Sequence, residues 1–113
     1  MQDCVFCKIV ERQSPADILY EDDQVLAFRD ARPAAPTHLL IVPKRHIPSV
    51  NELNQTDEAL VGSLFSTARL LAEQEQVHQS GYRLIVNTGP DSGQAVFHIH
   101  MHLLGGQRMR SLG

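Results

Sequence analysis

Three histidines stand at alternate positions in one short segment, which reads VFHIHMHLLGG over residues 96–106. A spacing of two is that of a β-strand, in which successive side chains point to opposite faces. We therefore expect His98, His100 and His102 to share one face of a strand. The apolar residues between them would share the opposite, core-facing side: Phe97, Ile99, Met101 and Leu103.

A row of imidazoles could do two kinds of chemistry, because this side chain titrates near neutral pH. It could hold zinc in a catalytic site with three protein ligands. Alternatively, one imidazole could attack an electrophile while its neighbours donate hydrogen bonds. The strand by itself leaves both possibilities open. A solvated strand face is the plain alternative, but this one row contains half of the six histidines in the chain.

The loop GPDSGQ over residues 89–94 leads directly into the histidine segment. Its two glycines could let backbone amides converge on an anion such as a phosphate. An ordinary hairpin loop would use the same residue types. The phosphate interpretation therefore depends on the histidines that follow.

Cys4 and Cys7 have the spacing of a metal or redox pair. Two cysteines do not close a zinc site, and two half-buried cysteines on a helix are an equally good interpretation. A thioredoxin-like role is less favoured, because no strand precedes the pair. By themselves, His46 in a loop and His38 at a strand start would be ordinary polar residues. Asp30, at a strand end, could cap a turn or accept hydrogen bonds from sugar hydroxyls.

The remaining sequence predicts an α+β fold with a mostly antiparallel sheet. Hydrophobic spacing predicts one long helix from about Thr56, capped by Asn54 or Thr56 and followed by Gly81. A short N-terminal helix would have Asp3 as its N-cap. The predicted strands are the histidine segment and residues 18–21, 25–29, 38–42 and 82–87.

Length and composition limit the possible functions. A chain of 113 residues is expected to form one domain, 1–113, and 42% hydrophobic with 20% charged residues fits a compact globule. The net charge of −3 and a pI near 6.0 argue against nucleic-acid binding. No apolar run is long enough to span a membrane, and the N-terminus lacks the features of a signal peptide. We expect a cytoplasmic protein whose cysteines are thiols or metal ligands.

The histidine segment resembles the signature of the histidine triad family, in which three histidines alternate with apolar residues. The resemblance extends, in order, through FRD at 28–30, APTH at 35–38, Asn87 and Gly93-Gln94. It covers nearly the whole chain. The sequence is most similar to the bacterial branch of histidine triad nucleotide-binding proteins.

This resemblance implies an antiparallel sheet continued across a homodimer, and hydrolysis of purine nucleoside phosphoramidates such as AMP joined to an amine. His100 would be the nucleophile and would form a nucleotidyl-imidazole without help from a metal. His102 and His38 would hydrogen-bond the phosphate oxygens, and His98 and Asn87 would support nucleophile and phosphate. Cleavage of dinucleoside polyphosphates, or nucleotide binding by a scaffold with weak activity, are the alternatives.

The resemblance also implies a purine nucleotide ligand of the AMP or GMP type and a structural zinc ion. The nucleotide-binding residues would be Phe6, Ile9, Phe28, Asp30, Ala31, Asn87, Gly93, Gln94, Ala95, Val96, His100 and His102. Zinc-bearing relatives use a cysteine pair, a loop histidine and the first triad histidine. These positions correspond here to Cys4, Cys7, His46 and His98. Such a zinc would anchor the N-terminal helix to the catalytic strand without touching the phosphate.

Two features depart from the family pattern. Many relatives carry a serine where this chain has Ala95. Without that hydroxyl, only the backbone amide of Ala95 could contact the phosphate or the leaving group. The tail over residues 107–113 does not match the better-known eukaryotic ending. The preference for one amine leaving group therefore cannot be carried over from relatives.

Overall fold

Five antiparallel strands form the sheet that carries the end of the histidine segment. The structure is a computed structural model and describes residues 3–111. In chain order the strands are β1 (Ile18–Glu21), β2 (Val25–Arg29), β3 (Thr37–Pro43), β4 (Tyr82–Ile85) and β5 (Met101–Gly105). They are arranged as β1-β2-β3-β5-β4, and every neighbouring pair is antiparallel. The predicted α+β fold with an antiparallel sheet is confirmed.

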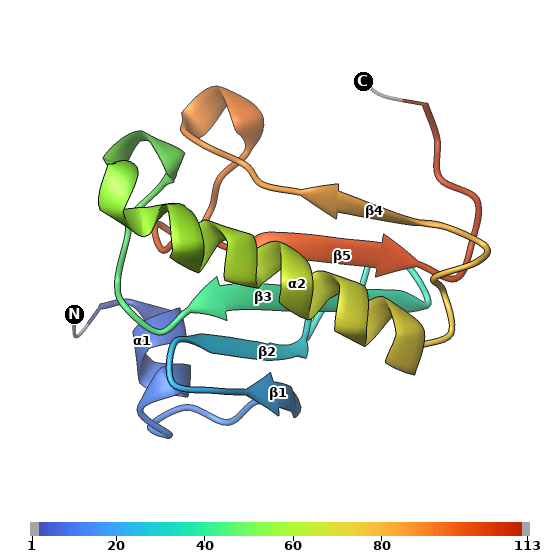
Figure 1. The fold of residues 1–113 in the computed structure, drawn as a ribbon, viewed down its shortest axis with the longest axis horizontal. Coiled ribbons are helices and arrows are strands. Elements are labelled where there is room, and N and C mark those ends of the chain that lie inside the picture. The colour runs from blue at the N-terminus through green and yellow to red at the C-terminus, as the bar shows by residue number, and fades with distance from the viewer. Residues whose placement is uncertain (1–2, 112–113) are drawn as a thin grey trace.

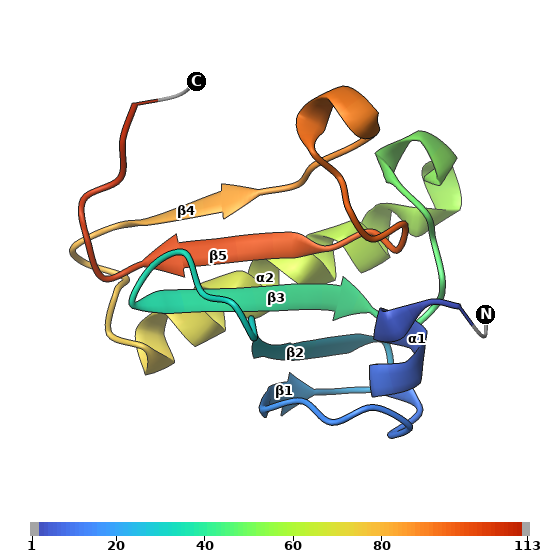
Figure 2. The same ribbon diagram turned by 180° about the vertical axis from the view of Figure 1, so that it is seen from behind.

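One helix lies on each face of the sheet. The long helix α2 (Glu58–Gln74) crosses the face seen in Figure 1, and the short helix α1 (Val5–Val10) lies against the face seen in Figure 2. The N-cap of α2 is Asp57, not Asn54 or Thr56 as expected. Asn54 instead closes a capping box with Asp57 in the 3₁₀ turn that leads into α2. The histidine chemistry is therefore to be sought on the α1 side, because α2 covers the main apolar core.

Two apolar clusters pack against the two faces. Ile99, Met101 and Leu103 of the histidine segment are buried in the cluster under α2. Phe6 and Ile9 of α1 belong to the second cluster, which lies on the opposite face against β2 and β3. The predicted alternation between core and histidine sides therefore holds from Ile99 onward. Phe97 was wrongly predicted as a core residue, since it is 54% exposed.

The strand in the histidine segment is shorter than the sequence predicted. β5 begins at Met101, so His98 and His100 precede the strand and His102 alone lies within it. The last pairing with β3 joins Met101 to Ile41. Two residues beyond Ile41, Pro43 has no N–H with which to continue the ladder.

A loop replaces β3 as the partner of the segment before β5. The amide of Ile99 donates a hydrogen bond to the carbonyl of Ile47 at 2.6 Å. His98 donates from its ring Nε2 to the carbonyl of Pro43 at 2.7 Å. These two contacts hold the segment straight enough for its side chains to go on alternating without regular strand pairing.

Helix α1 has a different N-cap from the one predicted. The cap is Cys4 rather than Asp3, and the Cys4 sulfur accepts a hydrogen bond from the amide of Cys7 at 3.3 Å. A thiol is an unusual cap compared with aspartate. The consequence is that both sulfurs of the pair lie at the same end of the helix, beside the histidine segment.

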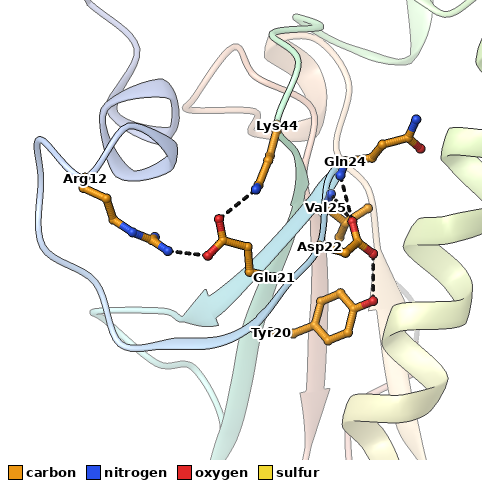
Figure 3. Close-up of polar contacts among 7 residues, drawn as sticks. All are labelled: Arg12, Tyr20, Glu21, Asp22, Gln24, Val25 and Lys44. Atoms are coloured by element: carbon orange, nitrogen blue, oxygen red, sulfur yellow. Dashed lines mark hydrogen bonds and ion pairs between the residues drawn. The ribbon is translucent and has the colours of Figure 1, made fainter.

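The hairpin of β1 and β2 holds the chain that follows α1. Figure 3 shows Glu21 of β1 between Arg12, which follows α1, and Lys44, which follows β3. The hydrogen bond from Lys44, together with the nearby Arg12, lowers the pKa of Glu21. In the hairpin turn, Asp22 accepts hydrogen bonds from two backbone amides and from the hydroxyl of Tyr20. The Arg12–Glu21 ion pair ties the chain after α1 to the sheet, and the Asp22 contacts fix the hairpin turn.

The prediction of no membrane-spanning segment agrees with the helices found. Within residues 3–111, no helix is both long enough and apolar enough to cross a bilayer. The expectations that concern Met1-Gln2 and the last two tail residues, Leu112-Gly113, lie outside the described residues.

Candidate active site

The ring of His100 is held in one orientation by the backbone of its own segment. Its Nδ1 lies 2.8 Å from the carbonyl oxygen of His98. A carbonyl can only accept, so Nδ1 must carry the proton. In the neutral ring, Nε2 then keeps its lone pair. The side chain is almost completely buried and lines the largest cavity described below.

A second chain of hydrogen bonds fixes the tautomer of His102. The amide of Ala34 donates to Nδ1 of His38 at 2.9 Å, so the proton of neutral His38 lies on Nε2. That Nε2 lies 2.9 Å from Nδ1 of His102 and donates to it. His102 must therefore carry its own proton on Nε2. The two cavity-lining histidines thus differ: Nε2 of His100 is a base, and Nε2 of His102 is a donor.

Burial keeps this pair of histidines uncharged at neutral pH. Desolvation lowers the pKa of His38, although Asp30, 3.4 Å away, acts in the opposite direction. Desolvation, reinforced by His100 and His38, lowers the pKa of His102 to about 4. A neutral His102 can donate a hydrogen bond to a phosphate oxygen without first being protonated.

The cavity that these rings line, the histidine cavity, has a volume of about 960 Å³. That size suits a small ligand such as a nucleotide. Eleven of the twelve residues that the sequence predicted for nucleotide binding line it: Phe6, Ile9, Phe28, Asp30, Ala31, Asn87, Gly93, Ala95, Val96, His100 and His102. Its wall is apolar under α1 and polar around the histidines.

Several lining residues were not predicted from the sequence. The chain after α1 contributes Pro15, Ala16 and Asp17, and β2 contributes Arg29. No motif of the sequence singled out these four residues as ligand-binding. Leu40 could have been found, since it pairs directly with His102 across β3 and β5 and so shares its face.

Gln94 is the predicted residue that does not line the cavity. Its side-chain amide accepts from the Gly89 amide and donates to the carbonyls of Pro48 and Val96. The amides of Gly93 and Gln94 are also bonded within the loop. The expected convergence of these loop amides on an anion is therefore wrong. Gly89 and Gly93 are needed for another reason, namely their positive φ angles of 83° and 86°.

A second cluster of possible ligands lies behind His100. The ligand atoms of Cys4, Cys7, His46 and His98 all lie within 4.8 Å of one another. Nδ1 of His98 is 3.3 Å from the Cys4 sulfur and 3.6 Å from the Cys7 sulfur. Nδ1 of His46 is 3.3 Å from the Cys7 sulfur. Sulfur and nitrogen ligands of one tetrahedral zinc ion lie about 3.5 Å apart.

The protonation pattern of His98 also suits a metal ligand. Its Nε2 donates to the carbonyl of Pro43, so its Nδ1 presents a lone pair to the sulfurs. Burial and the neighbouring Cys4 raise the pKa of the Cys7 thiol to about 11. Metal binding would therefore have to displace a proton from that thiol.

A third group of close side chains, Asp30, His38 and His102, fits a metal poorly. Nε2 of His38 carries a proton that it donates to His102, and its Nδ1 is held by the Ala34 amide. A ligand nitrogen needs a free lone pair. This group is better described as a hydrogen-bonded relay.

Phe6 of α1 connects the cysteine–histidine cluster with the histidine cavity. Its ring makes edge contacts with His100, at a centroid distance of 5.0 Å, and with His98, at 5.9 Å. It also packs edge-to-face on Phe28, at 5.6 Å. The position of α1 therefore determines both the apolar wall of the cavity and the packing on the His100 ring.

Comparison with known proteins identifies the family to which the chain belongs. The model of the HIT domain family matches residues 11–109, and the chain belongs to this family, the histidine triad proteins. The purine nucleoside phosphoramidase of Escherichia coli is 50% identical over 106 residues, which are 94% of this chain and 89% of that protein. An uncharacterised HIT-like protein of Synechococcus elongatus is 48% identical over 108 residues, covering 96% of this chain and 94% of that protein.

Solved structures support the fold. The HIT family hydrolase of Legionella pneumophila is 48% identical, with a TM-score of 0.95 and coverage of 96% of this chain and 97% of that chain. The HIT family hydrolase of Clostridium thermocellum is 46% identical, with a TM-score of 0.96 and coverage of 99% and 97%.

Proposed function

We propose that the protein hydrolyses purine nucleoside phosphoramidates through a covalent nucleotidyl-histidine intermediate. One observation carries the proposal: an Nε2 lone pair on His100 and an Nε2–H donor on His102 line the same nucleotide-sized cavity. The similarity to a bacterial purine nucleoside phosphoramidase over nearly the full chain supports the same reaction.

In the first step, Nε2 of His100 attacks the α-phosphorus. The phosphorus–nitrogen bond of the substrate breaks, and the amine leaves with the bonding electron pair and takes up a proton. A bond between phosphorus and His100 replaces the lost bond. In the second step, water attacks the same phosphorus and gives up a proton to solvent, which balances the proton taken up by the amine. The bond to His100 breaks, and the nucleoside monophosphate is released.

The neighbouring histidines have different supporting roles in this proposal. His102 donates to a phosphate oxygen as negative charge builds there. His38 is a positioning residue, because its one N–H is held by His102 rather than directed into the cavity. His98 acts through its carbonyl, which fixes the protonated nitrogen of His100.

The rest of the cavity suits a purine nucleoside. Phe6, Ile9 and Phe28 form an apolar wall for the base, and Ala31 adds to it. Asp30 lines the same cavity, 3.4 Å from the ring of His38, and its carboxylate can accept hydrogen bonds from both ribose hydroxyls. Asn87, Gly93, Gln94, Ala95 and Val96 are the proposed surroundings of the phosphate, with Gln94 holding the loop rather than touching the ligand.

The test of this function is turnover of a fluorogenic adenosine phosphoramidate beside a diadenosine polyphosphate. Release of the amine together with AMP is the expected result. Cleavage of the polyphosphate alone would assign the runner-up activity of the family. Binding of AMP without turnover of either compound would indicate a nucleotide-binding scaffold.

We also propose that Cys4, Cys7, His46 and His98 hold a structural zinc ion. The lone pair of His98 that faces the two sulfurs supports this set. With four protein ligands, such a metal has no open position for a substrate, so its contribution is to stability. Its effect on the reaction would be indirect, through α1 and Phe6.

A homodimer formed through β4 is part of the same proposal. Strand β4 is an edge of the sheet, and its sequence YRLI contains neither proline nor lysine that would discourage pairing. Pairing of two such edges would continue the sheet across two chains. Equilibrium sedimentation should give a mass of two chains, and a monomer would contradict the proposal.

The remaining expectations are also proposals. We infer that residues 1–113 form one domain in a cytoplasmic protein that binds neither nucleic acid nor membranes. Limited proteolysis that leaves one resistant fragment of nearly full length would support a single domain.

A further inference from the structure

Strand pairing extends the active-site face of the sheet beyond His102. In the ladder of β4 and β5, Ile85 pairs with His102 and Arg83 pairs with Leu104. Directly paired residues of antiparallel strands share a face of the sheet. The side of Arg83 is therefore the side of His102, opposite to α2.

A groove of about 680 Å³ runs over this extension. Its floor includes Ile85 and Leu104, and the C-terminal tail forms its wall. Asn87 lines both this groove and the histidine cavity, so the two spaces adjoin at that residue. A leaving group on the phosphorus would therefore lie on the side of the histidine cavity nearest this groove only if it is directed toward Asn87.

The groove concentrates positive charge. Arg83, Arg108 and Arg110 line it, and no aspartate or glutamate is among its described lining residues. We call these side chains and the space between them the arginine groove. The chain as a whole has a formal net charge of −3, so this local excess runs against the overall balance. Such a patch attracts anions even when the protein is acidic.

One contact ties the tail to the sheet at this point. The guanidinium of Arg83 donates to the backbone carbonyl of Arg110 at 2.6 Å. An arginine has five N–H donors, so Arg83 keeps others for a ligand. The contact also places the backbone of the tail beside β4, which brings Arg108 and Arg110 to the groove. Planar guanidinium groups match the geometry of carboxylates and phosphates.

We propose that the arginine groove is a subsite for a leaving group that carries its own negative charge. This inference rests on the proposed phosphoramidate chemistry and adds the class of amine. The amines it favours are acidic ones, such as amino acids with a carboxylate in the side chain. A phosphate-bearing leaving group has the same chemistry and is distinguished by the test.

The first experiment compares two adenosine phosphoramidates of nearly equal size. One carries glutamate through its α-nitrogen and the other carries glutamine, so they differ in one carboxylate. We expect kcat/KM to be about tenfold higher for the glutamate compound, as for interactions that steer charged ligands. Arg108→Gln and Arg110→Gln should each lower this ratio severalfold, and raising the salt concentration should lower it as well.

The matched control is Arg69→Gln. Arg69 is an exposed arginine of α2, on the other side of the sheet, and its removal changes the net charge equally. It should leave the ratio unchanged. Equal kcat/KM for the two compounds, or a ratio that falls equally in the control, would overturn the proposal.

A binding experiment separates this inference from the proposed function. Affinities of the same two compounds for His100→Asn report the groove even without turnover. An arginine-dependent preference without turnover in the wild type would refute the hydrolase and keep the subsite. Turnover without such a preference would support the hydrolase and refute the subsite. Arginine dependence seen for diadenosine tetraphosphate alone would assign the groove to phosphate rather than carboxylate.

Discussion

Nε2 of His38 lies 2.9 Å from Nδ1 of His102, and this contact decides which nitrogen of His102 can donate to a ligand. The Ala34 amide fixes the proton of His38 on Nε2, and His38 in turn fixes the proton of His102 on the far nitrogen. A residue in the loop before β3 thus sets the chemistry of a residue on β5.

His38→Phe should lower kcat while leaving the affinity for AMP within a few fold. The ring would keep most of the packing but would lose the hydrogen bond that orients His102. Losing a positioned donor to the transition state costs on the order of a hundredfold in rate. His38→Gln, which can still donate to His102, should recover part of the loss. Equal activities of the two variants would contradict a positioning role.

His100→Asn should abolish turnover and retain nucleotide binding. Removal of a covalent nucleophile lowers the rate by roughly a thousandfold or more. Mass spectrometry of quenched wild-type reactions should find the nucleotidyl group on His100. His78→Asn, at a histidine outside the cavity lining, is the control and should behave like the wild type. An adduct on His102 would show that the nucleophile is misassigned.

Asp30→Ala should weaken binding of AMP far more than binding of its dideoxy analogue. A lost hydrogen bond to a charged acceptor costs about 1.5–3 kcal/mol, and the analogue has no ribose hydroxyls to lose. Calorimetric titration of both ligands measures the difference. Asp23→Ala removes an aspartate outside the cavity lining and serves as the control. Equal losses for both ligands would rule out the ribose contact.

Protein purified without chelator should contain about one zinc ion per chain. Changing Cys4 and Cys7 together to serine should remove the metal and lower Tm, because the N-terminal helix then loses its anchor. His46→Asn should do the same, whereas His78→Asn should not. The chemical step should suffer less than the stability. Stoichiometric zinc in the double cysteine variant would refute this ligand set.

Stability should fall as the pH drops from about 6.5 toward 4, in part because of His102. The pKa of His102 is 6.5 in the unfolded chain and about 4 in the folded protein. Burial, followed by the nearby His100 and His38, opposes its protonation, whereas Asp30 favours it. The unfolded chain therefore binds a proton in this range before the folded chain does. The stabilisation is complete above pH 6.5 and is lost progressively as the pH falls to about 4.

Urea titrations across this pH range measure the effect. His102→Gln should flatten the pH dependence of the unfolding free energy, because the titrating group is removed. His78→Gln should keep the wild-type slope. Identical slopes in the wild type and His102→Gln would show that burial of His102 does not contribute.

Much of the fold could be read from hydrophobic spacing alone. The helical period after residue 56 and the period of two in the histidine segment are local properties. The helix begins close to the expected residue, whereas the strand forms only in the second half of the histidine segment. The errors fall where a distant residue intervenes. Pro43, on another strand, shortened β5. The cap of α1 is a local exception, since Cys4 took the position expected for its neighbour Asp3.

The sequence by itself determined the chemistry available to this protein: three alternating histidines, a cysteine pair and a carboxylate at a strand end. Residue type and spacing are enough for that, because they are fixed by the covalent chain. For His98 and His102, only the tertiary structure decided which ring nitrogen holds the proton. Those protons are assigned by the carbonyl of Pro43 and the ring of His38, each brought to its histidine from a separate part of the chain. A hydrogen bond of that kind depends on a distance that no local pattern encodes.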